Sequence, residues 1–140
     1  MSHNTLYTVL APLYDKIMNH VNYDLWFTLI QKIVSQHFPY GKPSILELGG
    51  GSGVLAKMLR NEGYTCLGSD YSFSMCKEAY KKGVPFFCSD ACHLPVKKTF
   101  PFAIFLYDSI NYLKTPNDYK NLFVEIYNLL DKLAMRRNFH

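Results

Sequence analysis

Four glycines stand within five residues directly after a short apolar run, at Gly49, Gly50, Gly51 and Gly53. The run covers residues 44–48 and predicts a buried strand. Residues 53–62 carry an apolar face at helical spacing and are followed by Gly63, where a helix stop is expected. A glycine-rich turn from a strand into a helix presents backbone N–H groups to a ligand. The sequence therefore predicts a β-turn-α unit with a binding loop.

The same alternation of strand and helix continues along the chain. Three further strands are predicted, at residues 65–69, 85–89 and 102–107. Residues 102–107 are apolar on both faces, which predicts a deeply buried strand. Two further helices are predicted, at residues 72–82 and 115–133. This order favours an α/β fold with a parallel sheet and right-handed crossovers.

The first 40 residues are predicted to form cap helices. Over residues 22–37 one helix face is expected to carry Leu25, Trp26, Leu29, Ile30 and Ile33. A shorter helical segment is expected at residues 5–10. It should end at Ala11-Pro12, because proline disfavours helical geometry in the residue before it. Tyr14-Asp15 would then lie near a break between helices. We expect one domain over residues 1–140, with the cap at 1–40, a core at 44–133 and a tail at 134–140.

The composition limits the location and the partners of the chain. Its 140 residues are 49% hydrophobic and 19% charged, which excludes a disordered chain. The net charge of +4 forms no basic stripe with interleaved aromatic residues, so no nucleic-acid partner is expected. The longest apolar run, residues 102–107, is too short to span a membrane. Four cysteines without a C-x-x-C pair, and no leader sequence, predict a reducing, cytoplasmic location.

The spacing of the glycines distinguishes between the known types of nucleotide-binding loop. The dinucleotide fingerprint G-x-G-x-x-G would need glycine at position 54, where Val54 stands. A phosphate P-loop would need a following Gly-Lys-Ser/Thr, which is absent from the sequence. The loop instead has the form E-x-G-x-G-x-G, beginning at Glu47.

Acidic residues are expected at the ends of all four strands, at Glu47, Asp70, Asp90 and Asp108. Ligands of open α/β sheets bind beyond the carboxyl ends of the strands, so these side chains should converge. Asp70 could accept hydrogen bonds from both hydroxyls of a ribose, and Asp90 with the N–H of Ala91 could read an adenine. Each aspartate alone could equally cap a turn, but their joint placement favours a nucleoside site.

A second group of potential ligands is Cys88, Cys92 and His93, spaced C-x₃-C-H. Thiolate and imidazole are zinc ligands, but no fourth ligand is evident nearby. Cys88 lies in an apolar strand and is expected to be a small buried residue. No metal is therefore predicted.

The segments ILELGGGSG, GSDYS, FFCSDA and FAIFLYDSINYL follow one another between residue 45 and about residue 113. In this order they resemble the motifs of the class I S-adenosylmethionine-dependent methyltransferases. The opening LYDKIMNHVNYDLW is similar to the N-terminal helix of small-molecule members of that family. The resemblance implies a Rossmann-like parallel sheet with helices on both faces and strand order 3-2-1-4. It also implies S-adenosyl-L-methionine as cofactor and a small molecule as methyl acceptor.

The same resemblance implies a role for residues along the strand ends. The methionine portion would be held by Glu47, Gly49, Gly50, Gly51 and Gly53, with Tyr14 and Tyr23 closing over its carboxylate. The nucleoside would be held by Asp70, Tyr71, Met75, Asp90 and Ala91, with Tyr71 and Met75 flanking the adenine. Asp108 and Ser109 would line the cofactor near the reactive methyl group. No catalytic residue is predicted, because the main task in methyl transfer from a sulfonium is to align the acceptor, the methyl group and the sulfur. If the acceptor arrives protonated, a general base is needed, and the candidates are Tyr14, His20, His93 and Tyr112.

Family members carry three more strands after the last helix, and none can be read here. The fourth strand would then be an open edge. We expect either a truncated product with impaired activity or an edge that pairs with a second copy or another polypeptide. A non-catalytic S-adenosylmethionine-binding module, or half of a two-chain enzyme, is the alternative function. A nicotinamide-dependent oxidoreductase is disfavoured by Val54.

Overall fold

The computed structural model describes residues 8–106 and 113–130. Its strands are β1 (Ile45–Leu48), β2 (Cys66–Asp70), β3 (Phe86–Cys88) and β4 (Phe102–Phe105). All neighbouring strands pair in parallel, in the order β3-β2-β1-β4. Strand β1 is buried along its whole length, as expected of a central strand. The α/β class and the strand order 3-2-1-4 are confirmed.

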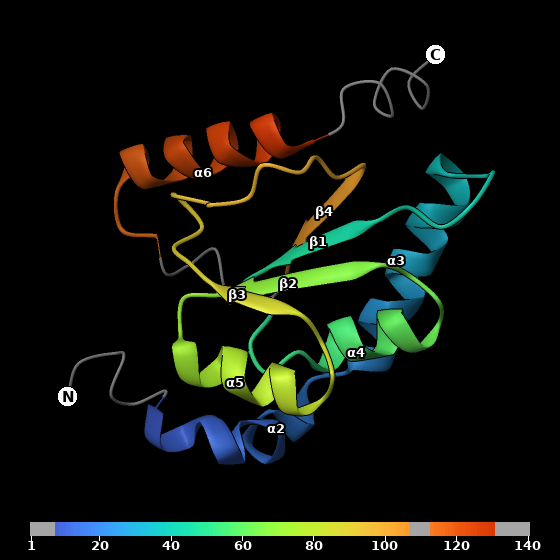
Figure 1. Cartoon of the computed structure of the whole chain (residues 1–140). Helices are drawn as coiled ribbons and strands as arrows, with labels where there is room; N and C mark the ends of the chain where they lie inside the picture. The colour runs from blue at the N-terminus through green and yellow to red at the C-terminus, as the bar shows by residue number, and fades with distance from the viewer. Residues whose placement is uncertain (1–7, 107–112, 131–140) are drawn as a thin grey trace.

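Helices cover both faces of the sheet (Figure 1). On one face α3 (Tyr23–His37), α4 (Val54–Asn61) and α5 (Phe73–Lys81) lie over a shared apolar core. On the other face α6 (Pro116–Leu129) packs over a second apolar cluster. Because the strands are parallel and each crossover helix follows a strand, the carboxyl ends of the strands and the N-termini of the following helices lie on the same side of the sheet. None of the helices in the described part of the chain is long and apolar enough to cross a membrane.

Local signals at the helix ends explain the boundaries. Asn22 caps α3 by accepting a hydrogen bond from the Leu25 N–H at 3.0 Å. Ser72 caps α5 through the Met75 N–H at 3.3 Å. Helix α5 ends at Lys81, and Gly83 follows with a φ angle of 77°, in the left-handed region that suits a glycine after a helix. The helix bounds predicted for this part of the chain are thus confirmed to within a residue or two.

The predicted break near Tyr14-Asp15 is wrong. Helical geometry runs through residues 8–10 and then through η1 (Ala11–Leu13), α2 (Tyr14–Ile17) and η2 (Met18–His20). Pro12 stands in the first turn of η1, where its missing N–H would have no intrahelical partner. Proline therefore divides the segment into short helical turns instead of ending it.

The predicted apolar face of α3 is confirmed only in part, and α6 likewise leaves some of its apolar residues exposed. In α3 the buried residues are Ile30 and Val34, whereas Leu25 is 65% exposed and Leu29 is 44% exposed. In α6 Leu122 and Leu129 are buried, but Phe123 is 59% exposed. Both helices carry apolar residues around much of their circumference, so periodicity alone does not select the face that docks.

Strand β4 is shorter and less buried than predicted. It ends at Phe105, and only Ile104 is buried, while its neighbours in the strand are half-buried. The reason is its position: β4 pairs with β1 on one side and is the outermost strand of the described sheet. Just outside it, Phe100 and Leu130 form an isolated parallel bridge that ties the end of α6 to the sheet.

The cap of α6 gives a test of local helix stability. Thr115 and Asp118 form a capping box, in which the Thr115 hydroxyl accepts from the Asp118 N–H at 3.2 Å. We expect Thr115→Ala to lower the free energy of unfolding by about 1 kcal/mol, because the capping box loses its side-chain acceptor and that N–H keeps only the Thr115 carbonyl. Urea unfolding followed by circular dichroism measures the change. Thr28→Ala, which removes a hydroxyl inside the exposed face of α3, is the control and should change stability little.

Candidate functional site at the carboxyl ends of the strands

The turn after β1 takes a backbone shape that needs glycine. Gly51 and Gly53 have φ angles of 60° and 82°, in the left-handed region. Gly53 caps α4, and a Cβ atom there would lie 2.8 Å from the Cβ of Ala79 in α5. The glycine at 53 thus lets the start of α4 approach α5 closely.

Gly50 allows a carboxyl group to lie directly beneath the loop. A Cβ atom at this position would lie 2.5 Å from Oε1 of Glu47 and 2.9 Å from Cζ of Phe86. The Gly50 N–H donates instead to the carbonyl of Ser69 in β2, at 2.9 Å. The loop is therefore bound to the neighbouring strand, with the side chains of Glu47 and Phe86 packed closely against Gly50.

Glu47 is a buried acid that lacks one partner. It is 5% exposed, and its Oε2 atom has no hydrogen-bond partner among the described residues. Burial, together with the nearby charge of Asp70, raises the pKa of Glu47 to about 8. A buried polar atom without a partner is costly, so a ligand that donates a hydrogen bond here would stabilise the site.

Asp70 ends β2 and holds the glycine loop. Its Oδ2 accepts from the Gly51 N–H and its Oδ1 from the Ser72 N–H, both at 2.9 Å. Burial raises the pKa of Asp70, while the backbone N–H groups of Ser72, Gly51 and Tyr71 lower it. Each carboxylate oxygen has two lone pairs, so both can accept a further hydrogen bond from a hydroxyl. The structure thus brings Glu47, the glycine loop and Asp70 together.

Asp90 lies in the turn after β3 with its carboxylate half-exposed. Its Oδ1 accepts from the Cys92 N–H at 2.9 Å, and its Oδ2 lies 3.6 Å from Nδ1 of His93. Ala91, beside it, is partly buried. The carboxylate is therefore held in place by its own turn and still faces solvent.

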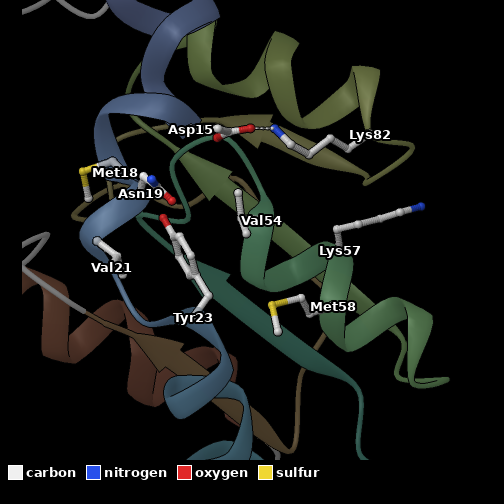
Figure 2. Close-up of a pocket in the computed structure, with 9 residues that line it drawn as sticks. All are labelled: Asp15, Met18, Asn19, Val21, Tyr23, Val54, Lys57, Met58 and Lys82. Carbon is white, nitrogen blue, oxygen red and sulfur yellow. Dashed lines mark ion pairs between the residues drawn. The ribbon is translucent and has the colours of Figure 1, made fainter.

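The other residues predicted to contact the cofactor differ in exposure and in position relative to the glycine loop. Tyr71 is 70% exposed, whereas Met75 is 1% exposed and is buried within the fold. Tyr14 lies against the loop, with Cε1 3.2 Å from where a Cβ atom of Gly51 would stand. Tyr23 lines a cavity between the N-terminal segment and α4 (Figure 2). Asp108, Ser109 and Tyr112 lie outside the described residues, as does the side chain of His20.

Three residues around the loop were not predicted, namely Asp15, Ser52 and Lys82. The Ser52 hydroxyl donates to Asp15, and the Lys82 ammonium lies 2.9 Å from Asp15 Oδ2 and 2.8 Å from the Ser52 carbonyl oxygen. Ser52 stands inside the glycine segment, which is a signal that could have found it. Asp15 and Lys82 are far apart in the sequence, and no local pattern links them.

The cysteines do not assemble a metal centre in the described part of the chain, where no three His, Cys, Asp or Glu side chains lie close enough to hold an ion. Cys92 is buried, with its thiol donating to the Asp118 carbonyl at 3.3 Å. Cys88 is exposed, which corrects the prediction that it is buried. It ends the short strand β3, which lies at the edge of the sheet, and its thiol donates to the Tyr71 carbonyl at 3.3 Å.

Comparison with known proteins points to one family. The profile of the methyltransferase domain family matches residues 45–132. A protein of Geobacillus sp. (strain WCH70) named as a methyltransferase is 34% identical over 130 residues, which are 89% of this chain and 53% of the relative. The chain thus spans about half the length of this curated relative.

Two solved structures share the fold. An S-adenosylmethionine-dependent methyltransferase from Clostridium acetobutylicum is 28% identical, with a TM-score of 0.74 over 90% of this chain and 54% of that one. An amino pentose methyltransferase from Micromonospora echinaspora, solved with S-adenosylmethionine bound, is 15% identical, with a TM-score of 0.76 over 85% and 52% of the two chains. With its glycine loop and strand-end carboxylates inside the matched segment, this chain belongs to the methyltransferase domain family.

Proposed function

We propose that this chain binds S-adenosyl-L-methionine over the carboxyl ends of β1, β2 and β3, and that it serves the transfer of the methyl group to a small-molecule acceptor. The observation that carries the proposal is the buried Glu47 carboxyl beneath the glycine loop, with Asp70 holding the same loop from β2. The family membership and the S-adenosylmethionine-dependent relative of known structure support it.

The residues present fit this cofactor at its methionine end. The partnerless Oε2 of Glu47 calls for a hydrogen-bond donor, and the α-amino group of the methionine portion is one. Gly49, Gly50, Gly51 and Gly53 keep side chains away from the space above that carboxyl group. Tyr14, which lies against Gly51, and Tyr23 are proposed to close over the carboxylate.

The nucleoside end has a matching set of groups. Asp70 is proposed to accept hydrogen bonds from the ribose hydroxyls in addition to the two N–H groups it already holds. Asp90 and the N–H of Ala91 would read the adenine edge, and the exposed ring of Tyr71 would cover its face. Met75, which is 1% exposed, is proposed to flank the adenine from within the fold. Asp108 and Ser109 complete the proposed set near the methyl group.

The bound cofactor supplies a methyl group on an already activated sulfonium leaving group. The residues of the chain therefore need to align donor and acceptor and to exclude water, and no general base is compulsory. Rossmann-like residues 44–133 would bind the cofactor and residues 1–40 would cap it, within one domain of residues 1–140. A cytoplasmic location, where its cysteines would stay reduced, is the environment that we propose for this reaction.

A second candidate function is cofactor binding without turnover, by a module that is completed by another chain or by a second copy. The outer edge of β4 favours it, because this edge has no neighbouring strand within the described residues. Edge strands with free backbone groups readily pair with another strand. Sedimentation velocity of the purified chain, alone and with ligand, would separate a monomer from a self-associated form.

Calorimetric titration with S-adenosylhomocysteine, with NAD as the comparison ligand, tests the proposed function. We expect saturable binding of S-adenosylhomocysteine and none of NAD. Light scattering of the same sample establishes that the protein is not aggregated. A folded, unaggregated chain that binds neither ligand would contradict the proposal, and binding of NAD alone would indicate an oxidoreductase.

A further inference from the structure

The N-terminal segment is fastened to the glycine loop by a small polar network. The Oδ1 atom of Asp15 in α2 accepts a hydrogen bond from the Ser52 hydroxyl. The Oδ2 atom of the same carboxylate lies 2.9 Å from the Lys82 ammonium. The same ammonium donates to the Ser52 carbonyl at 2.8 Å. Figure 2 shows Asp15 and Lys82 reaching toward each other from α2 and from the end of α5. Three separate parts of the chain therefore meet at one loop residue.

Two neighbouring loop residues are thus held from opposite directions. Asp70 binds the N–H of Gly51 from the sheet, whereas Asp15 and Lys82 bind Ser52 from the helices. Tyr14 precedes Asp15 in α2, and its ring lies on Gly51. Fixing Asp15 against Ser52 consequently fixes the ring of Tyr14 over the loop.

Helix α2 is a short element at the surface. The helix is four residues long, and none of them is buried. The side chains of Asp15 and Lys82 are 45% and 25% exposed, so water competes for the ion pair. Such a contact is strong enough to bias the position of a short helix and weak enough to open reversibly.

We infer that Asp15 and Lys82 form a latch that holds Tyr14 over the glycine loop, which makes Lys82 a positioning residue for the cofactor site. The inference rests on the proposed function, because Tyr14 is expected to close over the methionine portion. A ligand bound beneath Tyr14 leaves when the latch opens. Loosening the latch should therefore speed dissociation and weaken binding.

The test compares Lys82→Met with Lys81→Met, which removes the same charge from the adjacent residue. Lys81 is exposed and pairs with Glu78 within its own helix. Surface plasmon resonance with S-adenosylhomocysteine should show about a three- to tenfold higher Kd and dissociation rate for Lys82→Met, and no change for Lys81→Met. Lys82→Arg, which keeps the charge, should restore most of the affinity.

Hydrogen exchange of the ligand-free protein provides a second readout. Amides of residues 14–20 should exchange faster in Lys82→Met than in Lys81→Met, while those of the central strands stay equally protected. Asp15→Asn should repeat the effect, and it decides the question if Lys82→Met does not fold.

Equal exchange and equal dissociation in Lys82→Met and Lys81→Met would overturn the latch. If the wild-type chain fails to bind S-adenosylhomocysteine, the proposed function fails, and the exchange comparison still decides whether the latch exists.

Discussion

Asp70→Ala is expected to weaken the binding of S-adenosylhomocysteine by tenfold or more. The substitution removes the proposed acceptor of the ribose hydroxyls, and a hydrogen bond to a charged group is worth about 1.5–3 kcal/mol. It also removes the partner of the Gly51 and Ser72 N–H groups, so the loop loses one of its ties to β2 and keeps the bond from the Gly50 N–H to the Ser69 carbonyl. Isothermal titration calorimetry measures the change in Kd directly.

Asp70→Asn separates the two roles of this carboxylate. The amide keeps one oxygen as an acceptor and loses the negative charge, so part of the loop geometry should survive while ribose binding weakens. Asp24→Asn, on the exposed first turn of α3, is the matched control and should leave the Kd unchanged. Unchanged affinity in a folded Asp70→Ala protein would remove Asp70 from the site.

Local sequence signals predicted the elements that carry this site. The cap at Ser72 and the glycine at position 83 each act within one helical turn, so they can be read without knowing the fold. The alternation of strands and helices then placed Glu47, Asp70 and Asp90 at one edge, because parallel strands with crossover helices end on the same side.

The features that the sequence did not predict depend on contacts between distant segments. Leu25 and Trp26 are both apolar, but packing selects the side of α3 that carries Trp26, Ile30 and Val34 and leaves Leu25 exposed. The ion pair of Asp15 with Lys82 likewise exists only once α2 has docked beside α5. Side-chain burial has the same origin, which is why Met75 is covered although it lies next to the predicted adenine region.

Glu47→Gln is expected to change how stability depends on pH. Burial raises the pKa of Glu47 to about 8 in the folded chain, compared with 4.5 for an unperturbed glutamate. Between these values the folded state holds a proton that the unfolded state has released, so stability falls as pH rises. The contribution is fully present below about pH 4.5 and is lost through pH 8, with a slope of about 1.4 kcal/mol per pH unit.

The neutral amide of Glu47→Gln has no such slope. Urea unfolding at several pH values from 5 to 8 should therefore show a flatter profile for the variant, which becomes more stable than wild type toward pH 8. Glu62→Gln, an exposed residue at the end of α4, is the control and should follow the wild-type profile. Parallel profiles for wild type and Glu47→Gln would show that Glu47 titrates normally.

The same carboxyl group links binding to proton release. If the cationic amino group of the methionine portion pairs with Glu47, it favours the ionised carboxylate and lowers the pKa of Glu47 in the complex. Binding at pH 7 should then release up to about one proton, because Glu47 is protonated in the free protein. Calorimetry in buffers of different ionisation enthalpy measures that proton. Release should disappear in Glu47→Gln and persist in Glu62→Gln, and binding without any release would mean that Glu47 stays neutral and does not pair with the amine.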